Sequence, residues 1–193
     1  KAVSLLNKIP LPLLLLILLL PLRLIYLGYS EYICDETVAL NWLRLNDSFY
    51  STEFLLLQHK GPMQYVIAGI VFLITKTVFN EYTFRLPFAL ANCLSLVVFY
   101  LFIKNVTKNK WAAFVSAFLF GVNGFLVAFG RIFQYQDLNL LFSISSLYFY
   151  SKISADGEKE DSVIKNSAVG TVFFCLSLLS HWDAVFIVPY LLF

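Results

Sequence analysis

Two short polar stretches could do chemistry in this otherwise apolar chain. One runs from Cys34 through Asp35, Glu36 and Thr37, and the other from Arg131 to Asp137. Each lies just outside a long apolar segment. Ionisable groups at a membrane edge are costly to desolvate, so the default interpretation is that they have a function. A carboxylate placed there could act as a general base, and a nearby arginine could hold a phosphate.

Composition places these residues in a membrane protein. Of 193 residues, 60% are hydrophobic and 13% are charged, whereas a soluble domain has about 25% charged residues. Long apolar segments run over 9–28, 61–79, 85–104, 111–129, 138–150 and 167–181, with another from 184. Several approach the length of a membrane helix. The sequence therefore predicts an all-α, polytopic transmembrane helix bundle with external juxtamembrane helices. The lysines are spread over loops, which gives no indication of a nucleic-acid partner.

The ends of the chain suggest a piece of something longer. The first residue is Lys1 and the last apolar segment is short, so we interpret 1–193 as the N-terminal portion of one transmembrane domain. The first segment could be a signal peptide, since Gly28-Tyr29-Ser30 loosely resembles a cleavage site. Pro21 and Arg23 interrupt its apolar run, which favours a retained membrane helix.

The lysines also predict the topology. Basic residues favour cytoplasmic loops, and lysines gather in 1–8, 104–110 and 152–165. All three clusters can be cytoplasmic only if the chain crosses the membrane an even number of times between the first two. Segments 9–28 and 85–104 supply two crossings. We therefore expect 61–79 to be a juxtamembrane helix that dips into the outer leaflet, although it is nearly long enough to cross.

This topology gathers many ionisable residues on the external face. They are Asp35, Glu36, His59, Lys60, Arg85, Arg131, Asp137, His181 and Asp183. Asp35 stands where an N-cap would, before a short amphipathic helix that contains Trp42. We expect Asp35 and Asp137 to line one water-facing cavity, with a basic residue beside them.

The order of these residues resembles a known family. Asp35-Glu36, and then His59-Lys60-Gly61-Pro62 opening an apolar helix, are similar to the Asp-Glu and His-Pro-Pro-Leu landmarks of lipid-phosphate-sugar glycosyltransferases. The stretch 80–87 resembles their Gly-x-x-x-x-x-Arg-Leu-Pro segment, and 130–137 resembles their Ser-Arg-x-x-x-x-Asp stretch. These landmarks belong to the protein O-mannosyltransferase and aminoarabinose transferase group, which has the GT-C fold. The resemblance covers about 20–150.

The resemblance implies a reaction. A sugar leaves a polyprenyl-phosphate carrier in the membrane and joins a hydroxyl of a protein or glycolipid acceptor on the non-cytoplasmic face, with inversion. It implies that Asp35 is the general base and Asp137 a second catalytic carboxylate. The expected substrate-binding residues are Glu36, His59, Lys60, Arg85, Arg131, His181 and Asp183. It also implies a multi-pass protein of a bacterial or archaeal plasma membrane, with the active site facing outside.

One departure from the family concerns a metal. Gly61 stands where the family often has a first proline. Some members bind a divalent ion near this position and near a later histidine, which makes His59 and His181 candidate ligands. Two histidines are fewer protein ligands than a metal site usually has. The sequence therefore does not establish a cofactor, and a bound divalent metal stays an open alternative.

Other roles remain open at this stage. Asp35 and Asp137 could simply cap helices, and the arginines could extend their charged ends to the membrane surface. A transporter with an acidic and histidine relay is the alternative function, and a non-catalytic assembly protein is a third. Transporters usually place ionisable residues near mid-membrane and show internal repeats. Here the acids lie at segment ends, which favours a transferase.

Overall fold

The structure is a computed structural model that describes residues 10–33, 35–45, 61–76, 80–153 and 160–191. Over these residues it is built from helices alone, which confirms the predicted all-α fold. In chain order they are α2 (Leu11–Leu24), α3 (Asp35–Leu45), α5 (Met63–Thr75), α6 (Glu81–Thr107), α7 (Lys110–Val122), α8 (Gly124–Phe129), α9 (Tyr135–Ile153), α10 (Glu160–Ser180), the 3-10 helix η1 (Trp182–Ile187) and α11 (Val188–Leu191).

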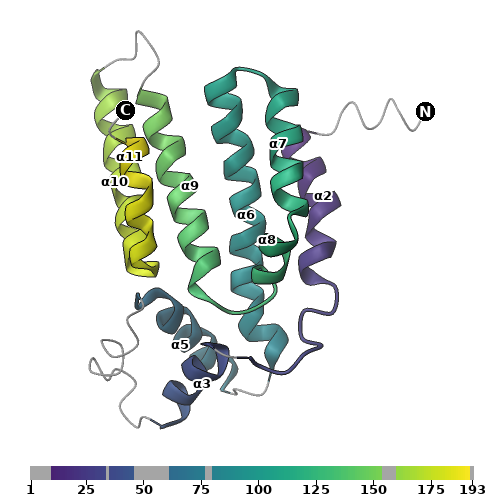
Figure 1. Ribbon diagram of the computed structural model, residues 1–193. Coiled ribbons are helices and arrows are strands. Elements are labelled where there is room, and N and C mark those ends of the chain that lie inside the picture. The colour runs from purple at the N-terminus through teal and green to yellow at the C-terminus, as the bar shows by residue number, and fades with distance from the viewer. Residues whose placement is uncertain (1–9, 34, 46–60, 77–79, 154–159, 192–193) are drawn as a thin grey trace, which may run out of the picture.

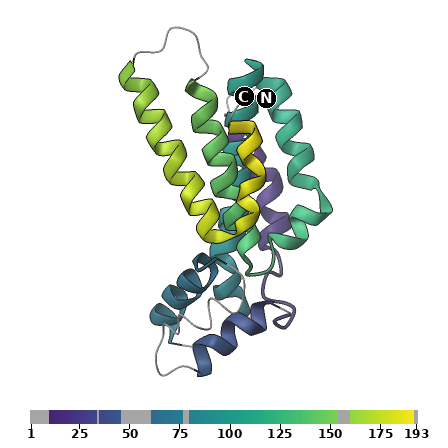
Figure 2. The same cartoon turned by 60° about the vertical axis from the view of Figure 1, so that its left-hand side comes forward.

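Five helices lie side by side as a bundle, and two others sit at one end of it. Figure 1 shows α2, α6, α7, α9 and α10 in the bundle, with α3 and α5 below, and the turned view in Figure 2 agrees. Helices α6 and α9 begin at the end occupied by α3 and α5, whereas α2, α7 and α10 finish there. The α6–α7 turn and the end of α9 therefore lie at the opposite end, together with their lysines.

The position of α5 agrees with the expectation drawn from the lysines. It packs with α3 beyond the end of the bundle instead of running through it (Figure 2). Its 13 residues span about 20 Å, short of the ~30 Å hydrocarbon core of a bilayer. The helix ends at Lys76, whose φ of 56° is left-handed. Segment 61–76 thus has the geometry of a juxtamembrane helix.

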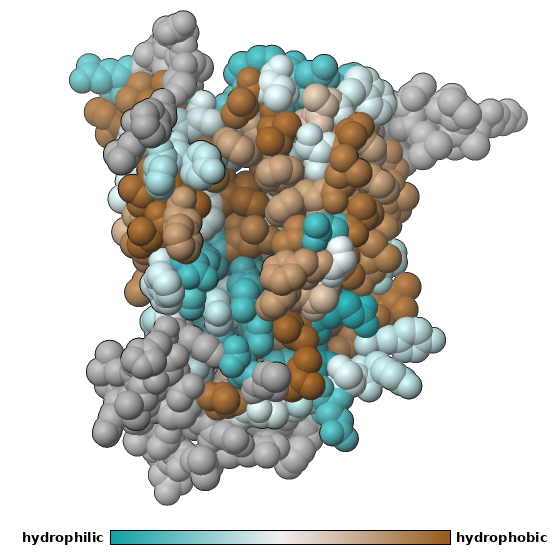
Figure 3. All heavy atoms as spheres, viewed as in Figure 1, coloured by the Kyte–Doolittle hydropathy of each residue, from teal (hydrophilic) through white to brown (hydrophobic). Residues whose placement is uncertain are grey.

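Within the described residues, α6 and α10 are long and apolar enough to cross a membrane. Figure 3 shows hydrophobic side chains over much of the visible face of the bundle, with hydrophilic ones near its upper end and beside the lower group. The apolar segment 111–129 is divided, because Asn123 ends α7 and caps α8. Its Oδ1 accepts hydrogen bonds from the N–H groups of Phe125 and Leu126. This break directs the chain into residues 130–134.

Phe133 fixes that segment in the core at the α3–α5 end. Its ring is fully buried and lies 5.8 Å from the ring of Phe84 and 5.5 Å from that of Phe88, between ring centroids. Both partners belong to α6, and the same cluster includes Leu40 of α3 and Tyr65 of α5. A second cluster joins α2, α6 and α7 further along the bundle. The first core therefore holds the turn before α9 against both juxtamembrane helices.

Candidate functional site

The candidate site lies at the end of the bundle where α3, α5 and the start of α9 meet. Asp35 is the first residue of α3 and is partly exposed. The Nε2 atom of Gln134 donates a hydrogen bond to its Oδ2 at 3.4 Å. Burial, and then the charge of Asp35, raise the pKa of Tyr65 to about 12. Asp35 thus stands at a helix N-terminus, as predicted, between α5 and the segment before α9.

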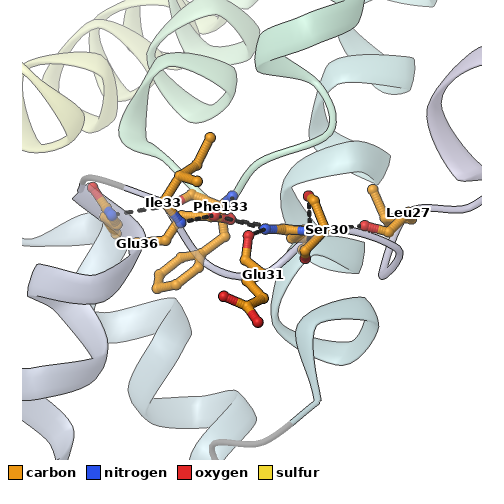
Figure 4. Close-up of polar contacts among 8 residues, drawn as sticks. Leu27, Ser30, Glu31, Ile33, Glu36 and Phe133 are labelled. Atoms are coloured by element: carbon orange, nitrogen blue, oxygen red, sulfur yellow. Dashed lines mark hydrogen bonds and ion pairs between the residues drawn. The ribbon is translucent and has the colours of Figure 1, made fainter.

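The next residue, Glu36, forms a buried ion pair with Arg85. Glu36 is 0% exposed and Arg85 is 1% exposed. The Nε and Nη2 atoms of Arg85 donate to the two carboxylate oxygens of Glu36, each at 2.8 Å. The same oxygens accept from the backbone N–H of Phe133 at 2.8 Å and of Ile33 at 3.0 Å (Figure 4). Glu36 therefore ties α3 to α6 and to the segment before α9.

Arg85 also fixes the chain between α2 and α3. Its Nη1 donates to the carbonyl oxygens of Leu27 at 3.1 Å and Ser30 at 2.9 Å, and its Nη2 donates to that of Glu31 at 2.9 Å. With the two bonds to Glu36, all five N–H groups of the guanidinium have acceptors. The predicted substrate contact of Glu36 and Arg85 stays a prediction. The geometry favours a positioning role, because each residue already has the other as its partner.

Arg131 holds the end of α2. Its Nη1 donates to the carbonyl oxygen of Leu22 at 2.9 Å, and its Nη2 donates to that of Tyr26 at 3.1 Å. A cation at the C-terminal carbonyls of a helix is also favourable electrostatically. The predicted contact with substrate is untested, and the observed contacts connect the segment before α9 to α2.

We expected Asp137 and Asp35 to line one water-facing cavity, but Asp137 is buried. Its side chain is 1% exposed, and its Oδ1 accepts a hydrogen bond from Nδ2 of Asn92 at 2.7 Å. Asn92 belongs to α6 and is equally buried. The expectation was wrong because Asp137 belongs to the first turn of α9, and at that position the packing against α6 buries it.

Several polar residues of this region were not predicted from the sequence. Arg23 and Asn92 are buried partners in the bundle, and Gln64 donates from Nε2 to the carbonyl oxygen of Phe133 at 3.2 Å. Gln134 contacts Asp35. An arginine inside an apolar segment was a usable signal, whereas amides among apolar residues gave no comparable indication.

His181 and Asp183 follow α10 at the same end of the molecule. The ring of His181 is stacked on that of Tyr135, with centroids 4.2 Å apart. Its Nδ1 accepts a hydrogen bond from the N–H of Asp183 at 3.2 Å and lies 3.0 Å from that residue's Oδ2. His181 is 7% exposed, and the Asp183 side chain is 44% exposed. The stacked pair thus joins the end of α10 to the start of α9.

Gly61 brings the segment before α5 against the end of α10. A Cβ atom added at Gly61 would overlap the carbonyl oxygen of Leu179 and lie 2.6 Å from the carbonyl carbon of Ser180. A proline at this position would meet the same backbone, which gives the departure from the family pattern a physical reason. His59 and Lys60 directly precede Gly61 but lie outside the described residues.

The described residues do not supply a metal centre by themselves. Across these ranges, no group of three or more His, Cys, Asp or Glu side chains is placed to hold an ion. His181 instead contacts Tyr135 and Asp183. His59, the other candidate ligand, is outside the described part of the chain, so the metal alternative stays open.

Comparison with known protein families shows to which family the chain belongs. A family model described as dolichyl-phosphate-mannose-protein mannosyltransferase matches residues 59–193, more than half of the chain. The chain belongs to this family. Its members are membrane glycosyltransferases of the GT-C group that take sugar from a polyprenyl-phosphate donor, which confirms the resemblance seen in the sequence. The match begins after Asp35 and Glu36. No curated protein and no solved structure matches the chain.

Proposed function

We propose that this chain is the N-terminal portion of a glycosyltransferase that moves a hexosyl or pentosyl group to an acceptor hydroxyl, with Asp35 as general base. The position of Asp35 carries the proposal. Asp35 is partly exposed at the end of the bundle, while its neighbour Glu36 is held by Arg85 and two backbone N–H groups. A carboxylate at a fixed helix N-terminus is an arrangement suited to a general base.

Asp35 would act at the moment of attack. The acceptor oxygen forms a bond to the anomeric carbon while its proton passes to the Asp35 carboxylate. The bond from that carbon to the phosphate oxygen breaks, and the lipid phosphate leaves with the electron pair. Attack opposite the leaving group inverts the configuration at the anomeric carbon. Proton transfer to a positioned carboxylate typically contributes about 10²–10⁴ in rate.

Lys60 is the favoured partner for the departing phosphate. The donors of Arg85 are committed to Glu36 and to backbone carbonyls, and Arg131 binds the end of α2. Lys60 adjoins Gly61, which contacts the end of α10 just before His181. An ammonium group there would stabilise the developing negative charge. His181 and Asp183 remain proposed contacts of donor or acceptor.

The proposed site faces away from the cytoplasm. The α6–α7 turn with its lysines lies at the end of the bundle opposite α3 and α5, and lysine-rich loops favour the cytoplasmic side. The acceptor is then a protein or glycolipid hydroxyl on the outer side of a bacterial or archaeal plasma membrane. The same arrangement supports a multi-pass topology.

The test replaces Asp35 by Asn in the full-length protein and follows transfer from a radiolabelled polyprenyl-phosphate mannose. We expect a loss of about 10²–10⁴ in rate, because the amide keeps the shape but cannot accept the proton. Glu160→Gln is the control, since this carboxylate begins α10 at the opposite end of the bundle. An Asp35→Asn enzyme within a few-fold of wild type would show that Asp35 only caps α3.

A further inference from the structure

A second polar network lies inside the bundle, away from the Glu36–Arg85 pair. Arg23 is 0% exposed, and Asn92 and Asp137 are each 1% exposed. The Nε atom of Arg23 donates to Oδ1 of Asn92 at 2.7 Å, and Nδ2 of Asn92 donates to Oδ1 of Asp137 at 2.7 Å. The Asn92 amide thus connects a buried guanidinium group to a buried carboxyl group, and burial of either without a hydrogen-bond partner would be costly.

This network joins most of the bundle. Arg23 of α2 also donates from Nη2 to the carbonyl oxygen of Gly121 in α7 at 2.8 Å. Asn92 of α6 also donates to the carbonyl oxygen of Leu126 in α8 at 3.3 Å. Asp137 brings in α9, and its Oδ2 has no hydrogen-bond partner among the described residues. The bond from Asn92 is therefore the hydrogen bond that holds this carboxylate.

Gly130 makes room for the network. A Cβ atom at this position would lie 2.7 Å from Cγ of Asn92. A side chain at position 130 would therefore displace the Asn92 side chain.

Asp137 of the network lies in the first turn of α9, directly after the segment that contacts both acids of the proposed site. Phe133 and Gln134 immediately precede α9, which begins at Tyr135. Gln134 donates to Asp35, and the N–H of Phe133 donates to Glu36. A shift of Asp137 would move both donors together.

We propose that Arg23, Asn92 and Asp137 are positioning residues that fix the start of α9, and with it the preceding Phe133 and Gln134, against Asp35 and Glu36. Asp137 then affects transfer through this network and not by touching substrate. The proposal rests on the proposed function, because it assigns these residues to the placement of the general base.

The test exchanges the two network positions. Asn92→Asp with Asp137→Asn keeps one carboxylate and one amide, and lets Arg23 pair directly with the carboxylate on α6 while the amide on α9 donates to it. We expect Asp137→Asn alone to lower kcat. The double exchange should have a kcat about tenfold higher than that of Asp137→Asn, which is the size of coupling common between residues in one network. If the exchange is no more active than Asp137→Asn, a carboxylate is required at 137 itself and the proposal is overturned.

A second variant removes the far end of the network. Arg23→Gln should lower kcat per folded enzyme with little change in the KM for the acceptor, although Arg23 contacts neither Asp35 nor the segment before α9. Combined with Asp137→Asn it should add little further loss. An unchanged kcat in Arg23→Gln, or losses that simply multiply, would overturn the proposal. If Asp137→Asn yields no folded protein, recovery of a monodisperse protein by the exchange supports the network, and failure to recover it counts against it.

Two controls distinguish this proposal from a general loss of stability and from the proposed function of Asp35. Ser146→Ala removes a buried hydrogen bond from α9 to the carbonyl oxygen of Gly170 at 3.0 Å, outside the network. It should lower stability without changing kcat per folded enzyme, and an equal loss of kcat would sink the assignment. Asp35→Asn tests the proposed function separately, since it can abolish transfer whatever the exchange does.

Discussion

In the described part of the chain, the Glu36–Arg85 network and the Arg23–Asn92–Asp137 network each bury ionisable side chains, but they satisfy them in different ways. Glu36 and Arg85 contact each other directly, and backbone groups satisfy their remaining atoms. Arg23 and Asp137 communicate through the Asn92 amide. The direct pair lies where a loop must be held still beside the proposed base. The relayed pair lies between helices and connects more of them. Here one arginine holds the loop between α2 and α3, whereas a series of three side chains connects the packed helices.

Breaking the direct pair should have the largest effect on stability. Arg85→Ala leaves the buried Glu36 carboxylate with only its two backbone donors and frees the carbonyl oxygens of Leu27, Ser30 and Glu31. Removing one partner of a buried pair typically costs about 3–5 kcal/mol. Thermal unfolding of the detergent-solubilised protein measures this loss. A cost below that of Asn92→Ala would reverse the ranking of the two networks.

Gly61→Ala should have the next largest effect. The new Cβ meets the backbone at Leu179 and Ser180, which cannot move aside as a side chain end can, so we expect a cost of about 1–3 kcal/mol. Gly130→Ala should cost less, because its Cβ meets the side chain of Asn92 and not backbone. Gly124→Ala is the matched control, since nothing lies within 4 Å of its added Cβ. Equal unfolding temperatures for the Gly61 and Gly124 variants would contradict the close approach.

Arg131→Ala should have the smallest effect on stability. Two partly exposed hydrogen bonds to the end of α2 are lost, for about 1 kcal/mol in total. If Arg131 only holds α2, the KM for the polyprenyl-phosphate donor should stay near wild type, whereas Lys60→Ala should raise it. Steady-state kinetics of both variants separates the two roles. A raised donor KM in Arg131→Ala would assign the phosphate contact to this arginine instead.

The sequence predicted the arrangement of elements better than the contacts between side chains. Lysine placement predicted that 61–79 does not span the membrane, because the charge asymmetry of loops reports on topology, and α5 indeed packs beyond the end of the bundle. The motifs indicated the family, which the match over 59–193 confirms. The break at Asn123 was not predicted, because 111–129 was expected to form one apolar segment, although Asn-Gly favours a turn.

The direction of individual side chains was harder to predict. Asp137 was expected to face water with Asp35, and it is buried instead. A shift of one or two positions along a helix turns a side chain to another face, and position 137 faces α6. The Arg23–Asn92 contact joins residues 69 positions apart, and no local pattern encodes it. The fit of Gly61 against the end of α10 likewise exists only after packing.

The contact between Gly130 and Asn92 limits which residues can occupy these two positions during evolution. Two positions on different helices share one small volume, so a substitution at either is constrained by the residue at the other. Descendants of this chain can gain a side chain at 130 only after, or together with, a smaller or differently placed group at 92. Loss of the amide in turn removes the link between Arg23 and Asp137. Related sequences with a side chain at position 130 should therefore lack asparagine at position 92.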